Sequence, residues 1–354
     1  MKFILLLVTL LSFSLRSQTL DGQIIDSLNQ TPIPYAEIYI LELDLHTKSD
    51  KDGAFSITSE LPKKFQVLVT ASNYEFYKST LSNSSTDRLK FYLKQSHHEL
   101  EEVTVSGPKS TLQRNNTVHI ERMSLKDLNQ IANTTLGEAI SKIPGVYNTS
   151  TGLGISKPVI RGMQGIRVVS MLNGLRIENQ QWGGDHGLGI TSLGIGSVEV
   201  IKGPSSLLYG ADALGGVIYY VDEKYAAQDR TEFGFSTQNE SNTLGTTNQV
   251  WFKKSGSNVR FNLGASLSSH ADYRLPDNRF AANSRFTDNS IKSSLGWNRR
   301  KGVLNVRYTY NTTNAGIPGH THDLVIEESK LKVKEQSREQ RLPYQDFQNH
   351  YLSV

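Results

Sequence analysis

The stretch VRFNLGASL, residues 259–267, alternates strictly between apolar residues and polar or small ones. Val259, Phe261, Leu263 and Leu267 occupy one set of positions, and polar or small residues occupy the other. Because successive side chains of a β-strand point to opposite faces, this period of two predicts a strand with one apolar face. Such a face needs either a protein core or lipid to cover it. The neighbouring segments help to distinguish these two possibilities.

The same alternation recurs in LNVRYTY, residues 304–310, and in further segments from a first strand expected at 231–240. The connections between the segments are of two kinds, tight turns and long polar loops. They are the turns 254–257 and 299–302 and the loops 269–287 and 313–343. Tight turns at one end and long loops at the other are typical of a transmembrane β-barrel. A soluble sandwich also alternates, so the pattern alone leaves that alternative open.

Composition narrows the kinds of site that the chain can carry. It has 354 residues, 37% of them hydrophobic, and no cysteine. Disulfide frameworks and Cys-ligated zinc are therefore excluded, and any metal must be held by His, Asp or Glu. The formal net charge is +4, with Lys and Arg spread along the chain, so we expect no nucleic-acid partner.

The N-terminus, MKFILLLVTLLSFSLRSQ, places one Lys before an apolar run that ends in small residues. This order predicts a secretory signal peptide over residues 1–17, cleaved near Ser17. The run is shorter than the roughly 20 residues that a spanning helix needs, and no other segment reaches that length. We therefore expect an exported protein whose membrane residence, if any, comes from β-strands.

The remaining chain divides into four predicted segments, and the fold class is mainly β. They are a β-sandwich at 18–95, a linker at 96–116, a mixed α/β unit at 117–222 and the first strands of the barrel at 223–354. Within the α/β unit we expect helices at 125–130 and 135–143, the second capped by Thr134 or Thr135, and strands at 157–161, 166–172 and 197–202.

Three stretches of the α/β unit resemble one known family. They are LGEAISKIPGVYNTS at 136–150, KPVIRGMQGIRVVSMLNGLRI at 157–177 and IGSVEVIKGPSSLLYGADALGGVIYYV at 195–221. In this order they are similar to the plug domain of the TonB-dependent outer-membrane receptors of Gram-negative bacteria. The first unit resembles the carboxypeptidase-regulatory-like, transthyretin-like domain, which points to the Bacteroidetes type of receptor.

The resemblance implies a plug lodged inside a transmembrane barrel of about 22 strands in the outer membrane. It also implies a partner, the TonB–ExbB–ExbD complex, which acts through a short peptide called the TonB box. In this chain the TonB box is expected within LEEVTVSG, residues 100–107, on the residues Leu100, Glu101, Glu102, Val103, Thr104 and Val105. A short β-prone peptide in this linker fits recognition by strand addition to the edge of a partner sheet.

The plug motifs place charges beside glycine turns and give no catalytic constellation. They are Arg161-Gly162 and Lys202-Gly203-Pro204, whose charges we expect the polar lumen of a barrel to pair. The stretch GPSSLLYG lacks the Gly-Lys-Ser/Thr ending of a phosphate-binding loop. We therefore expect a binding and transport protein and not an enzyme.

One departure from the family concerns length. About six strands are expected between residues 231 and 354, and a barrel of about 22 strands needs several hundred residues. An open sheet would leave unpaired backbone edges in the bilayer, which is costly. We therefore interpret the chain as the N-terminal part of a receptor. A non-transporting fragment that acts as a periplasmic interaction module stays open as an alternative.

Successive strands cross the membrane in opposite directions, so their connections alternate between the two sides. This strand parity assigns the stretch GIPGHTHDL, residues 316–324, to the outside. If the first barrel strand runs outward, both tight turns lie on the periplasmic side and both long loops lie on the extracellular side. The plug offers a second polar stretch, NQQWGGDHGLG at 179–189, which corresponds to the loop that rises toward the outer apex in plug domains. We expect the two stretches to face one another.

The residues that would hold a metal are Asp185, His186, His320, His322 and Asp323. Imidazole and carboxylate are the zinc ligands that remain without cysteine, and copper or nickel accept the same imidazoles. The pairing also resembles the zinc-uptake branch of the family. We expect no permanently bound cofactor, and zinc as the favoured transported substrate. Haem, with one His as axial ligand, and a siderophore, near Arg176 and Trp182, stay open as other substrates.

Overall fold

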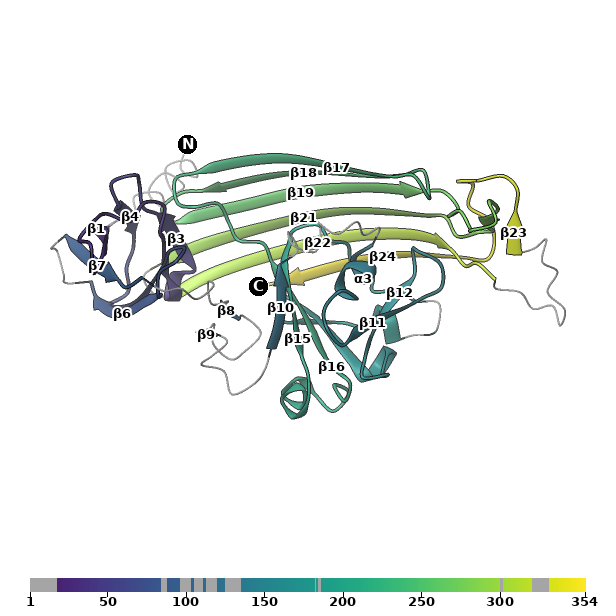
Figure 1. Cartoon of the computed structure of the whole chain (residues 1–354), viewed down its shortest axis with the longest axis horizontal. Coiled ribbons are helices and arrows are strands. Elements are labelled where there is room, and N and C mark those ends of the chain that lie inside the picture. The colour runs from purple at the N-terminus through teal and green to yellow at the C-terminus, as the bar shows by residue number, and fades with distance from the viewer. Residues whose placement is uncertain are drawn as a thin grey trace, which may run out of the picture.

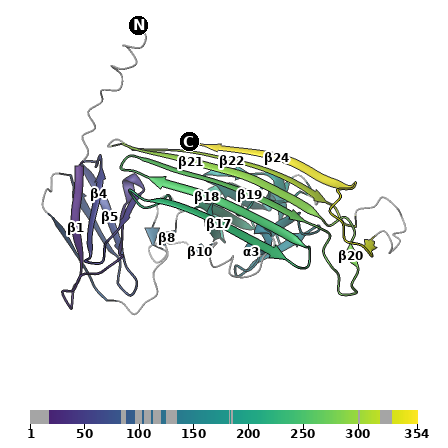
Figure 2. The same cartoon turned by 90° about the horizontal axis from the view of Figure 1, so that it is seen from above.

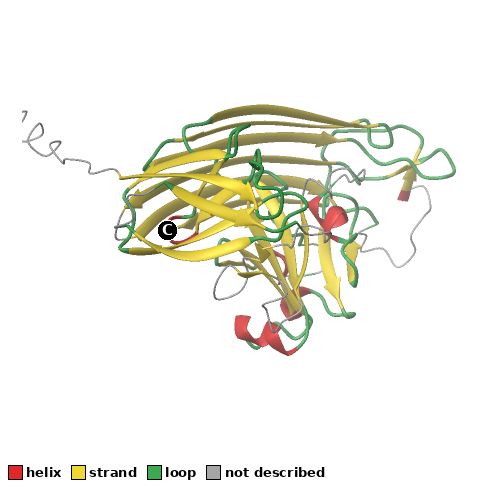
Figure 3. Cartoon of the chain, turned by 60° about the vertical axis from the view of Figure 1, so that its left-hand side comes forward, coloured by secondary structure: helices red, strands yellow, loops and turns green. Residues whose placement is uncertain are grey.

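The structure is a computed structural model, and strands make up most of it (Figures 1 and 3). It describes residues 18–83, 88–95, 103–104, 111–112, 120–124, 135–181, 183, 186–299, 302–319 and 331–354. The predicted signal peptide at 1–17 and the predicted helix at 125–130 lie outside these ranges. Among the described residues, no helix is long and apolar enough to cross a membrane.

The N-terminal domain consists of two packed sheets. One sheet contains β4 (Ala54–Ser59), β1 (Gln18–Asp26) and β7 (Leu89–Leu93), and the other contains β3 (Leu45–Lys48), β2 (Glu37–Ile40), β5 (Lys64–Thr70) and β6 (Tyr77–Ser82). β1 pairs antiparallel with β4 and parallel with β7. A short 3-10 turn, η1 (Leu41–Leu43), connects β2 to β3.

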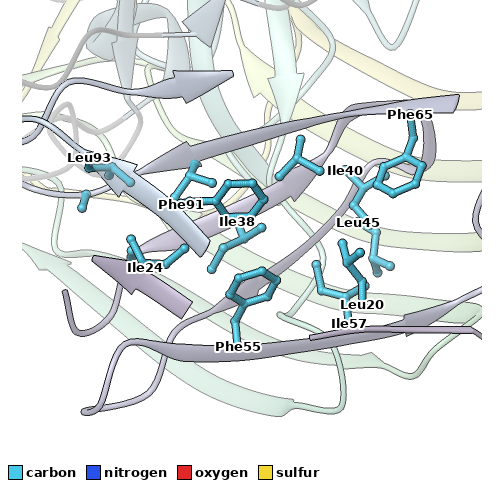
Figure 4. Packing of buried hydrophobic residues seen from close by; sticks show 14 of the residues in the cluster. Leu20, Ile24, Ile38, Ile40, Leu45, Phe55, Ile57, Phe65, Phe91 and Leu93 are labelled. Carbon is cyan, nitrogen blue, oxygen red and sulfur yellow. The ribbon is translucent and has the colours of Figure 1, made fainter. Parts of the chain in front are cut away.

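The core of this domain forms because its strands alternate. In β4, Phe55 and Ile57 are buried while Ser56 between them is exposed. Side chains such as Ile38 and Phe65 enter from the facing sheet and are wholly buried (Figure 4). Burial of this apolar surface is the main stabilising contribution to such a two-sheet fold.

A linker and the plug follow. The linker contains β8 (Val103–Thr104) and β9 (Thr111–Leu112), which pair antiparallel. The plug contains a five-stranded sheet and a two-stranded sheet. The five-stranded sheet has the order β10 (Ile120–Ser124), β15 (Ile195–Ile201), β16 (Gly216–Asp222), β13 (Val168–Leu172) and β14 (Leu175–Ile177), and the two-stranded sheet pairs β11 (Val146–Ser150) with β12 (Ser156–Ile160).

Short helical segments complete the plug. They are the helix α3 (Leu136–Ile140) and the 3-10 turns η3 (Gly165–Arg167), η4 (Asn179–Gln181) and η5 (Pro204–Tyr209). Thr135 caps α3, because its hydroxyl accepts a hydrogen bond from the backbone N–H of Glu138, as expected from the sequence. The strand predicted from residue 166 was wrong at its start. Gly165 has a φ of +63°, so the chain turns there and β13 begins only at Val168.

The C-terminal part is a six-stranded antiparallel sheet in which neighbouring strands follow in sequence order (Figures 1 and 2). Its strands are β17 (Thr231–Glu240), β18 (Gly245–Ser255), β19 (Val259–His270), β21 (Phe286–Arg299), β22 (Gly302–Gly316) and β24 (Tyr344–Ser353). The sheet is open, with β17 and β24 at its edges. The predictions of a mainly β fold and of six strands in this region are confirmed.

The connections of this sheet define two ends. We call the outer end the one at which residues 241–244, 271–285 and 317–343 connect the strands, and the inner end the one with the short turns. The loop expected from residue 313 begins only at 317, because β22 continues to pair with β21 and β24 through Ala315. Two short strands, β20 (Phe280–Ala281) and β23 (Lys332–Val333), pair within the outer connections.

The sheet is polar on the face that covers the plug and apolar on the opposite face. Asn262, Ser266 and Ser268 of β19 are buried, while Leu263 and Leu267 of the same strand are exposed. The plug lies against the polar face, on one side of the sheet (Figure 1). Lys292 of β21 joins them, because its ammonium group contacts Asp222 of β16 at 2.5 Å and the carbonyl of Gly194 at 2.9 Å.

The N-terminal domain contacts the inner end of the sheet. Arg260 of β19 is almost wholly buried and lies 3.5 Å from the carboxylate of Asp44. Its guanidinium also stacks on Tyr225, in the segment that joins the plug to β17, and donates to Asn298 of β21. Gln228 of the same segment donates to the backbone carbonyl of Thr58. Within the described ranges, this domain lies at the inner end of the sheet, and the outer end is at the opposite end (Figures 1 and 2).

Candidate functional site

The outer end brings together the plug and the start of the connection at 317–343. Ile155 of the plug packs in a buried cluster with Phe286 of β21 and Ala315 of β22. Gly152 approaches Pro318 so closely that a Cβ atom on Gly152 would lie 3.1 Å from the proline ring. The root of GIPGHTHDL therefore rests on the plug loop at residues 151–155.

His186 lies in the same neighbourhood. Its Nδ1 atom is 2.8 Å from the side-chain nitrogen of Gln345, at the outer start of β24. The next residue, Gly187, lies against the backbone of Ile155, because a Cβ atom on Gly187 would be 3.5 Å from its Cα. Further along this plug loop, the carbonyl of Gly189 accepts a hydrogen bond from Asn349 of β24.

Of the five residues predicted to hold a metal, the structure describes only His186. Asp185, His320, His322 and Asp323 lie outside the described residues. The two ends of the segment that carries the last three are described, and they are adjacent. A Cβ atom on Gly319 would lie 3.7 Å from the Leu331 side chain. Within the described ranges, no group of three or more His, Asp or Glu side chains is arranged to hold a metal ion.

A buried ion pair that the sequence did not reveal holds both ends of the connection at 317–343. We call its beginning the outgoing arm and its end the returning arm. Asp272 and Arg285, in the connection at 271–285, are almost fully buried and their charged atoms lie 2.7 Å apart. The carbonyl of Arg285 accepts from the backbone N–H of Gly316, on the outgoing arm. Its guanidinium donates to the carbonyl of Glu339, on the returning arm. We call this pair the Asp272–Arg285 clasp.

A polar cavity of about 60 Å³ lies beneath His186, between the plug and the inner face of the sheet. Hydroxyl groups of Thr191 from the plug and Ser266, Ser268 and Thr313 from the sheet line it, together with the Asp288 carboxylate. Gly187, which follows His186, belongs to its wall. Leu136, Leu188, Ile190 and Phe347 also contribute to the lining, so the cavity is polar in the main but not throughout.

The plug motifs take their partners largely from the plug itself. Lys202 lies 2.8 Å from the carboxylate of Glu121 on β10 and also donates to the carbonyl of Pro144. Arg161 and Gly162 both have positive φ values, +53° and +74°, and form the turn after β12. Gly203, before Pro204, has a φ of +84°, which favours glycine at the start of η5.

The predicted TonB box is described only in part. Val103 and Thr104 form β8, and their backbones pair with Leu112 and Thr111 of β9. Leu100, Glu101, Glu102 and Val105 lie outside the described residues. The extended backbone at β8 is the conformation that strand addition to a partner sheet requires.

Comparison with known families gives two matches. Residues 112–217 match the TonB-dependent receptor plug domain. Residues 20–105 match the CarboxypepD_reg-like domain. The first match contains the three stretches that carried the resemblance in the α/β unit nearly in full, and the second contains the two-sheet domain.

Two relatives are vitamin B12 transporters named BtuB. The protein of Photobacterium profundum is 32% identical over 100 residues, which cover 28% of this chain and 16% of that protein. The protein of Vibrio vulnificus is 33% identical over 95 residues, which cover 26% of this chain and 16% of that protein. The chain thus matches 16% of the length of each of these relatives.

Solved structures that the chain resembles include two metal transporters. The copper transporter OprC superposes with a TM-score of 0.48 and 19% identity, over 54% of this chain and 30% of that one. The FrpB iron transporter from Neisseria meningitidis gives a TM-score of 0.49 and 14% identity, over 55% and 32%. The two family matches show that the chain contains a plug domain of the TonB-dependent receptors and, before it, a CarboxypepD_reg-like domain.

Proposed function

We propose that this chain carries the plug and the first wall strands of an outer-membrane transporter that imports a metal ion or metal complex, with zinc as the favoured substrate. The observation that supports this most is the position of His186. It lies on the plug loop that touches Ile155, and the loop at Ile155 in turn supports Pro318. A histidine of the plug and the root of the His-x-His segment thus share the outer end.

The chemistry of these side chains favours a borderline metal ion. Imidazole nitrogen and carboxylate oxygen together suit zinc, and a catalytic or transport site with fewer than four protein ligands keeps a position open for exchange. His186 would supply one ligand, and His320, His322 and Asp323 would supply others. Because Gly319 and Leu331 are adjacent, the segment between them starts and ends beside the plug.

The polar cavity offers the transported ion a route away from this site. Gly187 is part of its wall, so it begins one residue after His186. Its hydroxyl groups and the Asp288 carboxylate are hard oxygen ligands, which bind zinc more weakly than imidazole does. A site that binds the ion at the surface, with a polar region beneath it that binds the ion more weakly, fits a transport function.

We further propose that the TonB–ExbB–ExbD complex supplies energy through the TonB box at Leu100–Val105. Val103 and Thr104 already have an extended backbone, and both belong to the short pairing with β9. A partner that adds a strand here would replace β9 as the pairing partner. Replacing Val103 with Pro should therefore abolish TonB-dependent uptake, because Pro removes a backbone donor from the pairing.

Zinc binding by the full receptor tests the proposed substrate. His186→Ala, and separately His320→Ala with His322→Ala, should each weaken Zn²⁺ binding by about tenfold or more. Changes outside the ligand shell already cost about 10- to 100-fold, and loss of a ligand should cost at least as much. His350→Ala is the matched control, because His350 lies on the opposite, exposed face of β24.

Two outcomes would redirect the proposal. Zinc binding and uptake that stay unchanged in both variants would exclude zinc as the substrate that these residues select. A shift of the haem absorption band on mixing the receptor with haem, lost in His322→Ala, would instead assign haem as the substrate.

A further inference from the structure

The segment that joins the plug to the sheet also closes one side of the N-terminal domain. We call residues 223–230, between β16 and β17, the connector. β3 and β4 are edge strands of the two sheets of the domain. Gln228 of the connector bridges them. Its backbone N–H donates to the carbonyl of His46 on β3, and its side-chain amide pairs with both backbone groups of Thr58 on β4.

This contact is buried and specific. Gln228 is 7% exposed, and Tyr225 and Ala226 of the connector are buried with it. The ammonium group of Lys224 lies 2.6 Å from the hydroxyl of Tyr39 on β2. Edge strands present unpaired N–H and C=O groups, and the connector satisfies such groups on both sheets at once. The N-terminal domain therefore has a built docking site on the connector.

Arg260 of β19 continues this contact into the sheet. Its guanidinium carbon lies 4.6 Å from the centroid of the Tyr225 ring, and one nitrogen donates to Asn298 at 2.9 Å. From the N-terminal domain, the backbone carbonyl of Asp44 accepts from the guanidinium, and the Asp44 carboxylate lies 3.5 Å away. Arg260 therefore fills the space between the sheet, the connector and the N-terminal domain.

Two separate cavities lie in line along the inner face of β19. The larger, of about 60 Å³, borders Ser268 and Ser266, and the smaller, of about 10 Å³, borders Gly264 and Asn262. Plug residues form the opposite wall of both. We call the row from Ser268 to Asn262, with its two cavities, the seam. Because alternate residues of a strand share a face, the next residue of this row toward the inner end is Arg260.

We propose that the N-terminal domain is a gate for the seam, which closes its inner end when docked on the connector and on Arg260 and opens it on undocking. A buried guanidinium needs acceptors for its N–H donors. Loss of Asp44 removes acceptors, so burial of Arg260 becomes unfavourable and its side chain turns toward water. Passage of an ion along the seam rests on the proposed function, whereas closure of the inner end does not.

Hydrogen exchange in the full receptor measures docking at the backbone N–H of residue 228, which donates to the N-terminal domain. Gln228→Ala removes both side-chain hydrogen bonds to Thr58 and should raise the exchange rate about tenfold. Gln23→Ala is the matched control. Gln23 also donates to a backbone carbonyl, that of Asp52, but within the N-terminal domain, so this variant should leave the rate unchanged.

Asp44→Lys tests the same contact through charge. It places a cation beside the guanidinium of Arg260 and should also raise the exchange rate at residue 228 about tenfold. The side chain of Asp44 is 67% exposed, so the core of the domain should stay intact and the test stays valid even if Gln228→Ala fails to fold. Asp52→Lys makes the same change of charge in the exposed turn before β4 and should have no effect.

Thiol labelling measures closure, because the chain has no cysteine of its own. Asn262→Cys introduces a thiol on the seam, next to Arg260 in the row. A small neutral methanethiosulfonate reagent should label it slowly in the docked receptor. Combined with Gln228→Ala or Asp44→Lys, labelling should become about tenfold faster, in step with the undocked population. Tyr92→Cys on β7 gives the rate of an exposed thiol, and the receptor without an introduced cysteine gives the background.

The outcomes separate the gate from the proposed substrate. Unchanged exchange at residue 228 in both variants would refute these contacts as the dock. Faster exchange with slow labelling at position 262 would show that docking does not close the seam, and so would labelling at position 262 in the docked receptor that is as fast as at position 92. Labelling that follows docking in a receptor that does not bind Zn²⁺ would uphold the gate and refute zinc as the substrate.

Discussion

The N-terminal domain and the six-stranded sheet are both built from strands with alternating apolar and polar residues, but their apolar faces differ in exposure. In the N-terminal domain, Ile38, Ile57 and Phe65 are wholly buried between two sheets. In the six-stranded sheet, Leu263 is 43% exposed and Leu267 is 63% exposed, while Arg260 on the same strand is 1% exposed. The first region hides its apolar face, and the second displays it.

The difference shows that alternation predicts strands but not the medium that each face meets. Two short sheets in water must cover their apolar faces with one another. A sheet with a polar plug on one side places its polar residues on that side and leaves its apolar residues facing outward. Lys292, for example, points toward Asp222 of the plug. An outward face of this kind is what lipid contact requires.

Phe65→Ala should have the largest effect, because it leaves a cavity in the core of the N-terminal domain. We expect the free energy of unfolding of this domain to fall by about 3–5 kcal/mol. Hydrogen exchange of peptides from 18–95 in the whole chain measures it. Tyr92→Ala is the control, since Tyr92 is 45% exposed on β7. Equal protection in both variants would show that this core does not stabilise the domain.

Leu263→Arg should reverse the character of the outward face of the sheet. An arginine near the middle of a lipid-facing strand costs about 2–4 kcal/mol. Folding of the full receptor into lipid vesicles, followed by gel mobility under denaturant titration, measures the loss. Ser236→Arg is the control, because position 236 lies on the opposite face from the exposed Phe235. A similar loss in both variants would contradict the assignment of the two faces.

Asp26 should make the stability of the N-terminal domain depend on pH in the acidic range. The backbone N–H of Asn29 donates to its carboxylate, as do Leu28, Tyr74 and Gln95, and together they lower the pKa of Asp26 from 3.8 to about 2. A lowered folded-state pKa stabilises the domain above the unfolded value, and this contribution is lost as the pH falls from about 4 to about 2.

Unfolding of the wild type and of Asp26→Asn across this pH range checks the dependence. The wild type should be more stable near neutral pH, and the difference should disappear by about pH 2. Asp21→Asn on the exposed side of β1 is the control. A difference between the wild type and Asp26→Asn that is constant with pH would mean that the charge of Asp26 contributes nothing.

Leu267→Ala should have the smallest effect, although the same chemical change is costly elsewhere. Leu93→Ala in the N-terminal core should cost about 2–5 kcal/mol, because Leu93 is 1% exposed. Leu267→Ala on the outward face should change the free energy of unfolding in detergent by about 0.5 kcal/mol or less. Denaturant titration of both variants compares them, and equal losses would mean that Leu267 faces a protein core.

Much of the fold follows from local patterns in the sequence. β17 spans the predicted residues 231–240, and Thr135 caps α3 as expected. The errors occur where long-range pairing overrides local signals. β22 extends to Gly316 because two neighbouring strands pair with it, although Asn311 and Asn314 are of a residue type that is depleted in strands.

The candidate site was only partly accessible from the sequence. His186 could be chosen because it stands among glycines in a stretch that corresponds to the outer apex loop of plug domains, and because strand parity placed GIPGHTHDL on the same side. Gln345 gave no such signal, since it is separated from His186 by 159 residues and glutamine is common. The Asp272–Arg285 clasp was missed for the same reason, because neither residue belongs to a motif and only folding buries the two together.

The sequence by itself determined the period of the strands, the positions of the turns and the plug motifs, because backbone geometry and residue chemistry act over a few neighbouring residues. Only the tertiary structure decided which face of each strand meets the plug and which plug loop supports Pro318. It alone decided which amide faces the His186 ring. These are contacts between distant segments, and their distances depend on how whole sheets pack and not on any local preference.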